Sequence, residues 1–175
     1  MKPKLIFLTA VTVIVFAGLL IIKNKNQSKT TVPATQTKEP QVASSPTIVD
    51  MSAVFAIYTK GTFRIFTDSK YHNLSDDVFI ESANPNIVHV KKRGVTWGDF
   101  FKTLPMKLSA DCLTTGTGQT FCSNEAQTLK FYVNGERAEN FLDAQINQND
   151  RALITYGAEG DSEIKEQLKK VDSIL

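Results

Sequence analysis

The sequence predicts an α+β domain that follows an N-terminal transmembrane helix. Residues 5–22 form an uncharged apolar run of 18 residues, at the short end of the length that crosses a bilayer. After residue 50, short segments of alternating apolar and polar residues recur between turn-forming residues, which is typical of strands. Two later segments, 97–104 and 164–171, place apolar residues at helical spacing. Many short strands with two helices indicate the α+β class.

The apolar run LIFLTAVTVIVFAGLLII is interpreted as an uncleaved signal anchor. Lysines lie on both sides of it, so the charge bias that sets orientation is nearly balanced. A cleaved signal peptide, with VFA at 15–17 as the cleavage site, is the alternative, although the apolar run continues past that point. We expect a single-pass protein of the cell membrane that contacts lipid through residues 5–22.

Residues 23–50 are predicted to form a disordered stalk, because they are rich in Ser, Thr, Gln and Pro and contain no aromatic residue. The folded domain is expected from residue 51 to residue 175. Residues 1–50 carry six lysines against two acidic residues, whereas residues 51–175 carry fourteen Lys and Arg against sixteen Asp and Glu. The domain is therefore close to neutral, which argues against nucleic acid as a partner.

The chain has two cysteines, Cys112 and Cys122, on either side of a segment that contains TTGTGQ. This segment has turn chemistry, so the cysteines would lie at two strand ends joined by a loop, with the sulfurs able to meet. A structural disulfide is predicted, and such bonds persist outside the cytoplasm. The alternative is a pair of unrelated buried thiols. The domain is accordingly expected on the extracytoplasmic side of the membrane.

The alternating segments give a set of expected strands and hairpins. AVFAIYTKGTFRIFT, residues 53–67, predicts a hairpin that turns at Lys60-Gly61, and LKFYVNGER, residues 129–137, predicts one that turns at Asn134-Gly135. Further strands are expected at 78–81, 87–92, 106–113, 119–123 and 151–156.

Two helices are expected. In the first, Thr96 is the N-cap and Asp99 occupies the N3 position of a capping-box variant. Its apolar face consists of Trp97, Phe100, Phe101 and Leu104. In the C-terminal helix, Asp161 is the expected cap, and Glu166 and Lys170 form an i, i+4 pair. The apolar face of that helix consists of Ile164, Leu168 and Val171.

The runs GVTWGDFFKTL and LKFYVNGERAENFLDAQINQNDRALITYG resemble β-grasp domains of the transcobalamin C-terminal-like and soluble-ligand-binding families. Those families share a VT-x-x-D-hydrophobic helix start, an aromatic strand ending in VNG, and a late strand ending in Tyr. The matching positions here are Val95, Thr96, Asp99, Phe100, 131–135, 149–150 and 153–157. The resemblance covers residues 94–157 and implies a β-grasp-like mixed sheet with one short central helix and a C-terminal helix.

Residues 71–101 also resemble a group of uncharacterised membrane-anchored bacterial proteins, in which the strand before the G-V-T-W-G-D-F-F run reads H-x-H. His89 matches the first histidine, but Lys91 stands in place of the second. If those relatives bind a metal, the resemblance implies that this chain has lost most of the site.

His72 and His89 are the candidate metal ligands of the chain. Asp76, Asp77 and Glu81 could add oxygen ligands, but their spacing matches no known motif. A zinc or copper site needs three or four such ligands that converge. A metal-binding surface protein with a degenerate histidine site is therefore an alternative function.

Other residues are candidates for binding a ligand. His89, Lys91, Lys92 and Arg93 precede a helix N-terminus and could hold an anion or a cell-wall polymer, or could simply be a solvated strand end. Tyr132 and Tyr156 could form an exposed aromatic face or could fill the core.

An enzyme is not expected, because the G-x-S-x-G elbow of serine hydrolases and the TLxTC strand of sortase-type transpeptidases are missing. The expected function is non-catalytic binding or assembly in the cell envelope, without a cofactor. The expected partner is a small ligand or another envelope protein, and an envelope enzyme remains the second alternative.

Overall fold

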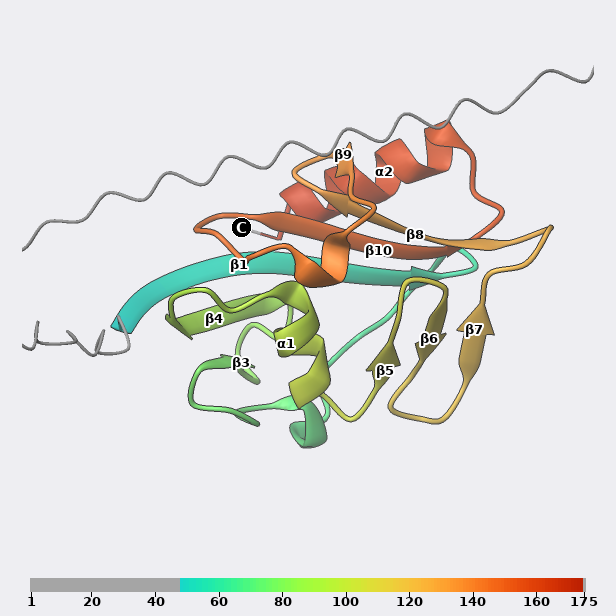
Figure 1. The fold of residues 1–175 in the computed structure, drawn as a ribbon. Coiled ribbons are helices and arrows are strands. Elements are labelled where there is room, and N and C mark those ends of the chain that lie inside the picture. The colour runs from blue at the N-terminus through green and yellow to red at the C-terminus, as the bar shows by residue number, and fades with distance from the viewer. Residues whose placement is uncertain (1–47, 175) are drawn as a thin grey trace, which may run out of the picture. The chain divides into compact units, whose positions relative to one another are not determined.

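The structure, a computed structural model, describes residues 48–174 of the chain (Figure 1). The predicted anchor at 5–22 and the first part of the predicted stalk, 23–47, lie outside the described residues. Residues 48–50, which we expected to end the stalk, belong instead to the first strand. Within 48–174, no helix has the length and apolar character that crossing a membrane requires.

The domain is a mixed α+β structure built on a seven-stranded sheet of order β3-β4-β1-β10-β8-β9, in which β2 also pairs with β1. β1 and β10 run parallel, from Val54 opposite Arg151 to Thr59 opposite Tyr156. The other neighbouring pairs of this sheet are antiparallel. The strands are β1 (Ile48–Thr59), β2 (Thr62–Phe63), β3 (Val78–Ile80), β4 (Ile87–Lys92), β8 (Thr128–Val133), β9 (Glu136–Arg137) and β10 (Arg151–Gly157).

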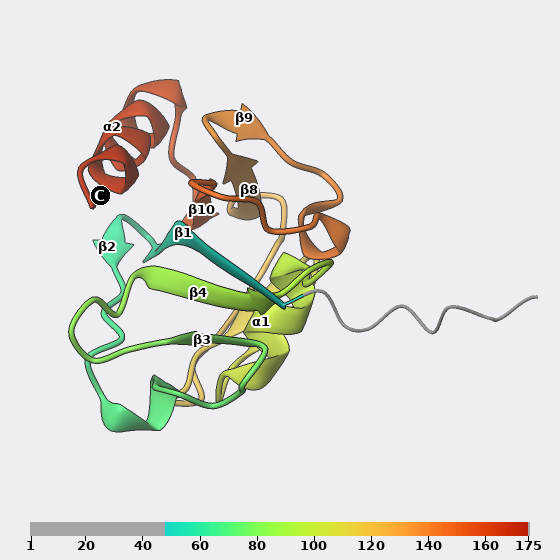
Figure 2. The ribbon, with the colours of Figure 1, turned by 90° about the vertical axis from the view of Figure 1, so that its left-hand side faces the viewer.

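The two central strands are apolar on both faces. In β1, every residue from 53 to 59 is buried, and in β10 every residue from 152 to 157 is buried. Parallel strands have apolar residues on both faces when both faces of the sheet are covered. Helix α1 (Trp97–Thr103) covers one face and helix α2 (Asp161–Asp172) the other, as Figure 2 shows. We call these the α1 face and the α2 face.

Both predicted hairpin turns are present. Asn134 and Gly135 have φ angles of 53° and 85°, the left-handed conformation that a type I′ turn requires between β8 and β9. Lys60 and Gly61, with φ of 51° and 73°, join β1 to β2 in the same way. The second arm of this hairpin is shorter than predicted, because residues 64–67 leave the sheet after Phe63.

The capping box of α1 is confirmed. The backbone N–H of Asp99 donates to Oγ1 of Thr96 over 3.1 Å, and the N–H of Thr96 donates to the Asp99 carboxylate over 3.2 Å. The predicted cap of α2 is wrong: Gly160 is the N-cap, with extended backbone, and Asp161 is already the first helical residue. Glu166 pairs with Lys169 at 2.6 Å, one position before its predicted partner.

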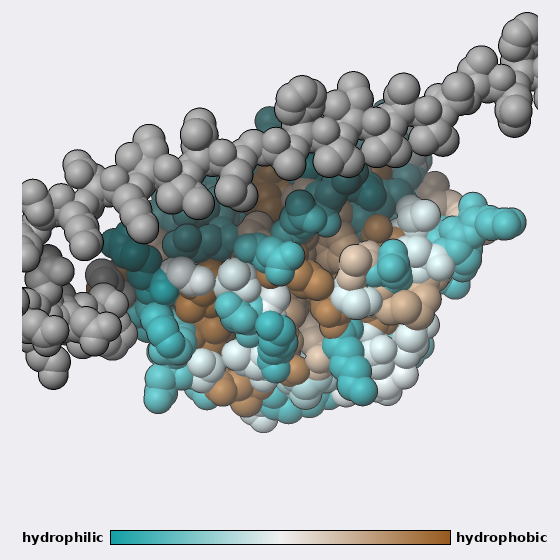
Figure 3. All heavy atoms as spheres, viewed as in Figure 1, coloured by the Kyte–Doolittle hydropathy of each residue, from teal (hydrophilic) through white to brown (hydrophobic). Residues whose placement is uncertain are grey.

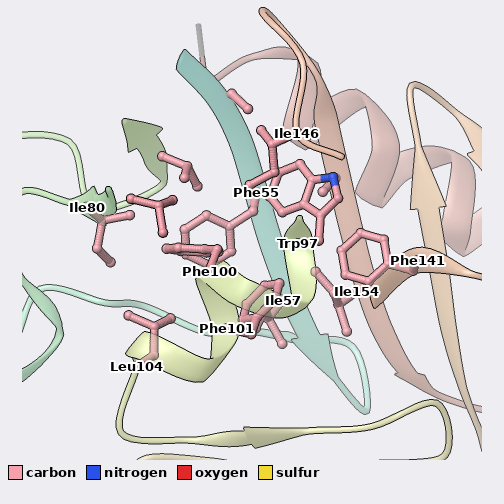
Figure 4. Packing of buried hydrophobic residues seen from close by; sticks show 14 of the residues in the cluster. Phe55, Ile57, Ile80, Trp97, Phe100, Phe101, Leu104, Phe141, Ile146 and Ile154 are labelled. Atoms are coloured by element: carbon pink, nitrogen blue, oxygen red, sulfur yellow. The ribbon is translucent and has the colours of Figure 1, made fainter. Parts of the chain in front are cut away.

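The main core lies on the α1 face. Trp97, Phe100 and Phe101 of α1 point onto the sheet, where they meet Phe55 of β1 and Phe141 of the 3-10 helix η2 (Phe141–Asp143) (Figure 4). On the α2 face, a smaller buried cluster consists of Val54, Ala56, Tyr58, Leu153, Ile164 and Val171.

A second, three-stranded sheet consists of β5 (Lys107–Leu108), β6 (Cys112–Thr114) and β7 (Thr120–Cys122). Cys112 and Cys122 lie directly opposite each other in the β6–β7 register, and the predicted disulfide joins them. The strands are shorter than predicted, because a turn closed by the 2.9 Å hydrogen bond from Ser109 N to Cys112 O separates β5 from β6. We call residues 112–122 the disulfide hairpin.

Candidate binding pocket

The predicted site residues do not converge on one place. On β4, the His89 ring stacks on the Phe79 ring with centroids 5.3 Å apart and an interplanar angle of 24°. Its Nε2 lies 4.0 Å from the Glu81 carboxylate. His89 therefore packs on the outer part of the sheet with an aromatic and an acidic neighbour.

The lysines of the basic cluster are paired with acidic residues. Lys91 Nζ lies 2.7 Å from Asp50 and lowers the pKa of that carboxyl through a hydrogen bond and its charge. Lys92 Nζ lies 2.9 Å from Asp77, which raises the pKa of the lysine in the same way. Arg93 is exposed at the strand end. An anion at this position would compete with the two carboxylates for the lysines.

The second candidate metal ligand, His72, is half-buried beside η1 (Ser69–Tyr71). Its Nε2 lies 2.8 Å from the carbonyl oxygen of Phe66, a contact that requires the ring to donate from Nε2–H. In the part of the chain that the structure describes, no three His, Cys, Asp or Glu side chains come together in a group that could hold a metal ion.

The two candidate tyrosines lie on opposite faces of the sheet. Tyr156 is buried on the α1 face, where its hydroxyl donates to the carbonyl oxygen of Cys122 over 3.1 Å. It thereby ties the central sheet to the disulfide hairpin. Tyr132 packs against the α2 cluster, with the Arg137 guanidinium 5.6 Å from its ring centroid. The two rings cannot form the common aromatic face that the sequence suggested.

The structure instead contains an apolar pocket that sequence reasoning missed. It has a volume of about 180 Å³ and opens between the segment after β2, the helix η1 and the disulfide hairpin. We call it the binding pocket. Its lining consists of Ile57, Phe63, Arg64, Ile65, Phe66, Tyr71, Met106, Leu113, Thr115, Gly116 and Thr117.

The inner wall of the binding pocket is part of the main core. Phe66 packs on Phe55 with ring centroids 5.0 Å apart and on Tyr71 at 5.2 Å. Leu113, at the base of the disulfide hairpin, is fully buried. Such contacts hold the inner wall in place.

The outer wall depends on a glycine. A Cβ atom at Gly116 would lie 2.4 Å from the Tyr71 hydroxyl and 3.0 Å from the Pro105 carbonyl oxygen. Only a residue without a side chain lets the loop of the disulfide hairpin approach Tyr71 this closely. The TTGTGQ segment signalled a turn in the sequence, but not the surface against which that turn packs.

The lining also contains an exposed isoleucine and an arginine. Ile65 is 69% exposed. Arg64 donates from Nε to Oγ1 of Thr59, and its guanidinium carbon lies 5.3 Å from the centroid of the Phe121 ring. Among the described residues, no Asp or Glu lines the binding pocket. On the face shown in Figure 3, apolar residues are interrupted by hydrophilic ones.

Comparisons with protein-family models, with curated proteins and with solved structures found no match for this chain.

Proposed function

We propose that the chain is a single-pass membrane protein whose extracytoplasmic domain is a non-catalytic binding module of the cell envelope. The observation that carries this proposal is the binding pocket, which is walled by core residues on one side and by the disulfide hairpin on the other. Concave, largely apolar sites with few polar groups are typical of small-ligand binding. The ligand would be a small molecule or a side chain of another envelope protein.

The disulfide supports the extracytoplasmic location, because such bonds form and persist in oxidising compartments. It agrees with the signal anchor expected at residues 5–22. Together they favour a domain held outside the cytoplasm by an N-terminal helix that contacts membrane lipid.

We also propose that the fold is β-grasp-like. Support comes from the order β4-β1-β10-β8, with β1 and β10 parallel at the centre and α1 placed between β4 and β8 in the sequence. The capped start of α1 and the VNG turn after β8, which carry two of the matching motifs, also support this proposal.

Methyl NMR on the full chain in lipid nanodiscs tests the binding function. A set of small apolar and amphipathic compounds is added to protein labelled at Ile, Leu and Met methyl groups. We expect saturable shifts at Ile65, Met106 and Leu113, and none at Ile164 on the α2 face. In a second sample labelled in the histidine rings, shifts of His72 and His89 on addition of zinc or copper, with no response at the pocket methyls, would instead favour the metal-binding alternative.

The location is tested by trapping thiols in cells that express the full chain. Rapid acid quenching followed by alkylation under denaturing conditions should leave Cys112 and Cys122 unmodified until a reductant is added. Complete alkylation of both cysteines without reductant would contradict an oxidising location for the domain.

A further inference from the structure

We infer that the binding pocket selects ligands in which one aromatic or branched aliphatic group lies next to a carboxylate, and that Arg64 binds that carboxylate. This inference rests on the proposed binding function and names its ligand class. The shared chemistry occurs in small carboxylic acids and in the C-terminal residue of a peptide.

The size of the binding pocket sets the apolar part of the ligand. A cavity of about 150 Å³ lined by Leu, Ile and Phe holds one benzene molecule. The binding pocket, at about 180 Å³ with Ile57, Phe66 and Leu113 in its lining, is of the same size and character. It therefore fits a single aromatic ring or a branched aliphatic group.

The charge of the binding pocket sets the polar part. Among the described residues that line the pocket, Arg64 is the one charged side chain, and no acidic residue accompanies it there. Within residues 48–174, Arg151 forms an ion pair with Asp172, and no other arginine forms one. Arg64 therefore has no carboxylate partner among these residues. An apolar pocket with an unneutralised guanidinium favours an anionic ligand over a neutral or cationic one.

The position of Arg64 suits this role. Its Nε donates to Thr59 and its guanidinium carbon lies near the face of Phe121, two contacts that restrain the plane of the group. The hydrogen bond uses one of the five N–H donors of the side chain and leaves the two terminal nitrogens to bind a carboxylate. Such pairs are often bidentate, which adds orientation as well as affinity.

Arg137 provides a matched control. Like Arg64, it places its guanidinium near an aromatic ring, that of Tyr132 at 5.6 Å, and it has no carboxylate partner among the described residues. It differs in lying at β9, outside the pocket lining. A general effect of removing a surface charge would therefore appear in both variants.

The test is a methyl NMR titration of the full chain in nanodiscs with 3-phenylpropionate and, separately, with the uncharged 3-phenylpropionamide. We expect the acid to bind at least about tenfold more tightly than the amide, since a charge-assisted bidentate pair contributes at least about one factor of ten in affinity. Arg64→Gln should remove that preference, whereas Arg137→Gln should change the affinity for the acid less than about twofold.

A second variant keeps the test decisive if Arg64→Gln disturbs the fold through Thr59. Ile65 is 69% exposed, so Ile65→Asp adds a negative charge beside the pocket at little cost to folding. It should weaken binding of the acid several-fold more than binding of the amide, because the added charge repels only the acid, whereas the loss of the isoleucine affects both compounds. A tripeptide ending in Phe with a free carboxylate distinguishes the sources: tighter binding than 3-phenylpropionate assigns a peptide C-terminus, and weaker binding assigns a small acid.

The ligand class would be overturned if the unmodified chain bound the acid and the amide equally well and each variant changed both affinities equally. The proposed binding function would still stand after that result. If neither compound nor the tripeptide shifts the methyl groups of Ile65, Met106 and Leu113, both the ligand class and the pocket as a binding site fail.

Discussion

On the α1 face of the central sheet, many aromatic rings pack against one another, whereas the α2 face holds a smaller, mainly aliphatic cluster that includes Tyr58, with buried polar groups beside it. Trp97 and Phe141 stack with centroids 5.5 Å apart, and Phe131 and Phe141 stack at 4.9 Å. Under α2, Thr155 is fully buried and Gln167 nearly so, and one oxygen of each side chain has no hydrogen-bond partner among the described residues. On the α1 face, the indole Nε1 of Trp97 likewise has no partner among the described residues.

The difference predicts where the stability of the domain lies. Buried aromatic side chains remove large apolar areas from water, and their paired geometries add to that gain. A buried hydroxyl or amide without a partner costs free energy instead. The binding pocket and the disulfide hairpin both adjoin the α1 face, through Leu113 and Phe121. The candidate site is therefore supported by the better-packed face.

The largest expected effect comes from opening a cavity on the α1 face. Trp97 is fully buried, so Trp97→Ala should lower the free energy of unfolding by about 3–5 kcal/mol. Ile164→Ala on the α2 face should cost about 2 kcal/mol, at the low end for such a change, because the buried cluster around it is smaller. Urea unfolding of the full chain, followed by far-UV circular dichroism, measures both. Equal losses would break the comparison between the faces.

Removal of the disulfide is expected to have the next largest effect. The joint replacement Cys112→Ser and Cys122→Ser frees a short loop, with ten positions from one cysteine to the other, and should cost about 2–3 kcal/mol in unfolding free energy. Because the disulfide hairpin forms one wall of the binding pocket, the methyl resonances of Leu113 and Met106 should broaden or shift while that of Ile164 stays. Treatment of the unmodified chain with a reductant is the matched control. A double variant with unchanged stability and pocket resonances would show that packing alone holds the hairpin.

Local patterns in the sequence predicted much of the fold. The Asn134-Gly135 turn, the Thr96 capping box and the apolar runs of β1 and β10 depend on neighbours a few residues apart. The disulfide was predictable for the same reason, since a Gly-rich loop brings the two cysteines together. The error at the start of α2 is also local: Asp161 and Gly160 are both acceptable caps, and sequence alone does not choose between them.

The candidate site could not be predicted in the same way. The binding pocket joins Phe63–Phe66 to Leu113–Thr117, segments about fifty positions apart, and no local pattern records that contact. The FRIF segment has the alternating pattern of a second hairpin arm. The sequence therefore gives no sign that residues 64–67 leave the sheet. Tyr156 alternates correctly along β10, but the face to which that alternation assigns it depends on the position of α1. Non-local packing therefore decides the site.

The smallest predicted effect compares the two helix starts. Thr96→Ala removes the N-cap of α1 and should lower the free energy of unfolding by about 1 kcal/mol, whereas Gly160→Ser, which adds a cap to α2, should raise it by a few tenths, on the order of 0.3 kcal/mol. Both effects can be read from the urea midpoint at neutral pH.

The capping box of α1 also affects how the free energy of unfolding depends on pH. The Thr96 N–H and hydroxyl, followed by Lys102, hold the pKa of Asp99 below its ordinary value of 3.8. Because the folded-state pKa is the lower one, the carboxylate stabilises the fold above pH 3.8, and this contribution is lost as the pH falls through the folded-state value. Thr96→Ala removes the hydroxyl but keeps the backbone N–H, so it should flatten part of the loss of stability below pH 3.8, and Gly160→Ser should leave that loss unchanged. Asp50, Asp68 and Glu163 also have lowered pKa values, so the difference between variant and unmodified chain isolates Asp99. If the free energy of unfolding of Thr96→Ala fell with pH as steeply as that of the unmodified chain, the capping box would not depend on the protonation of Asp99.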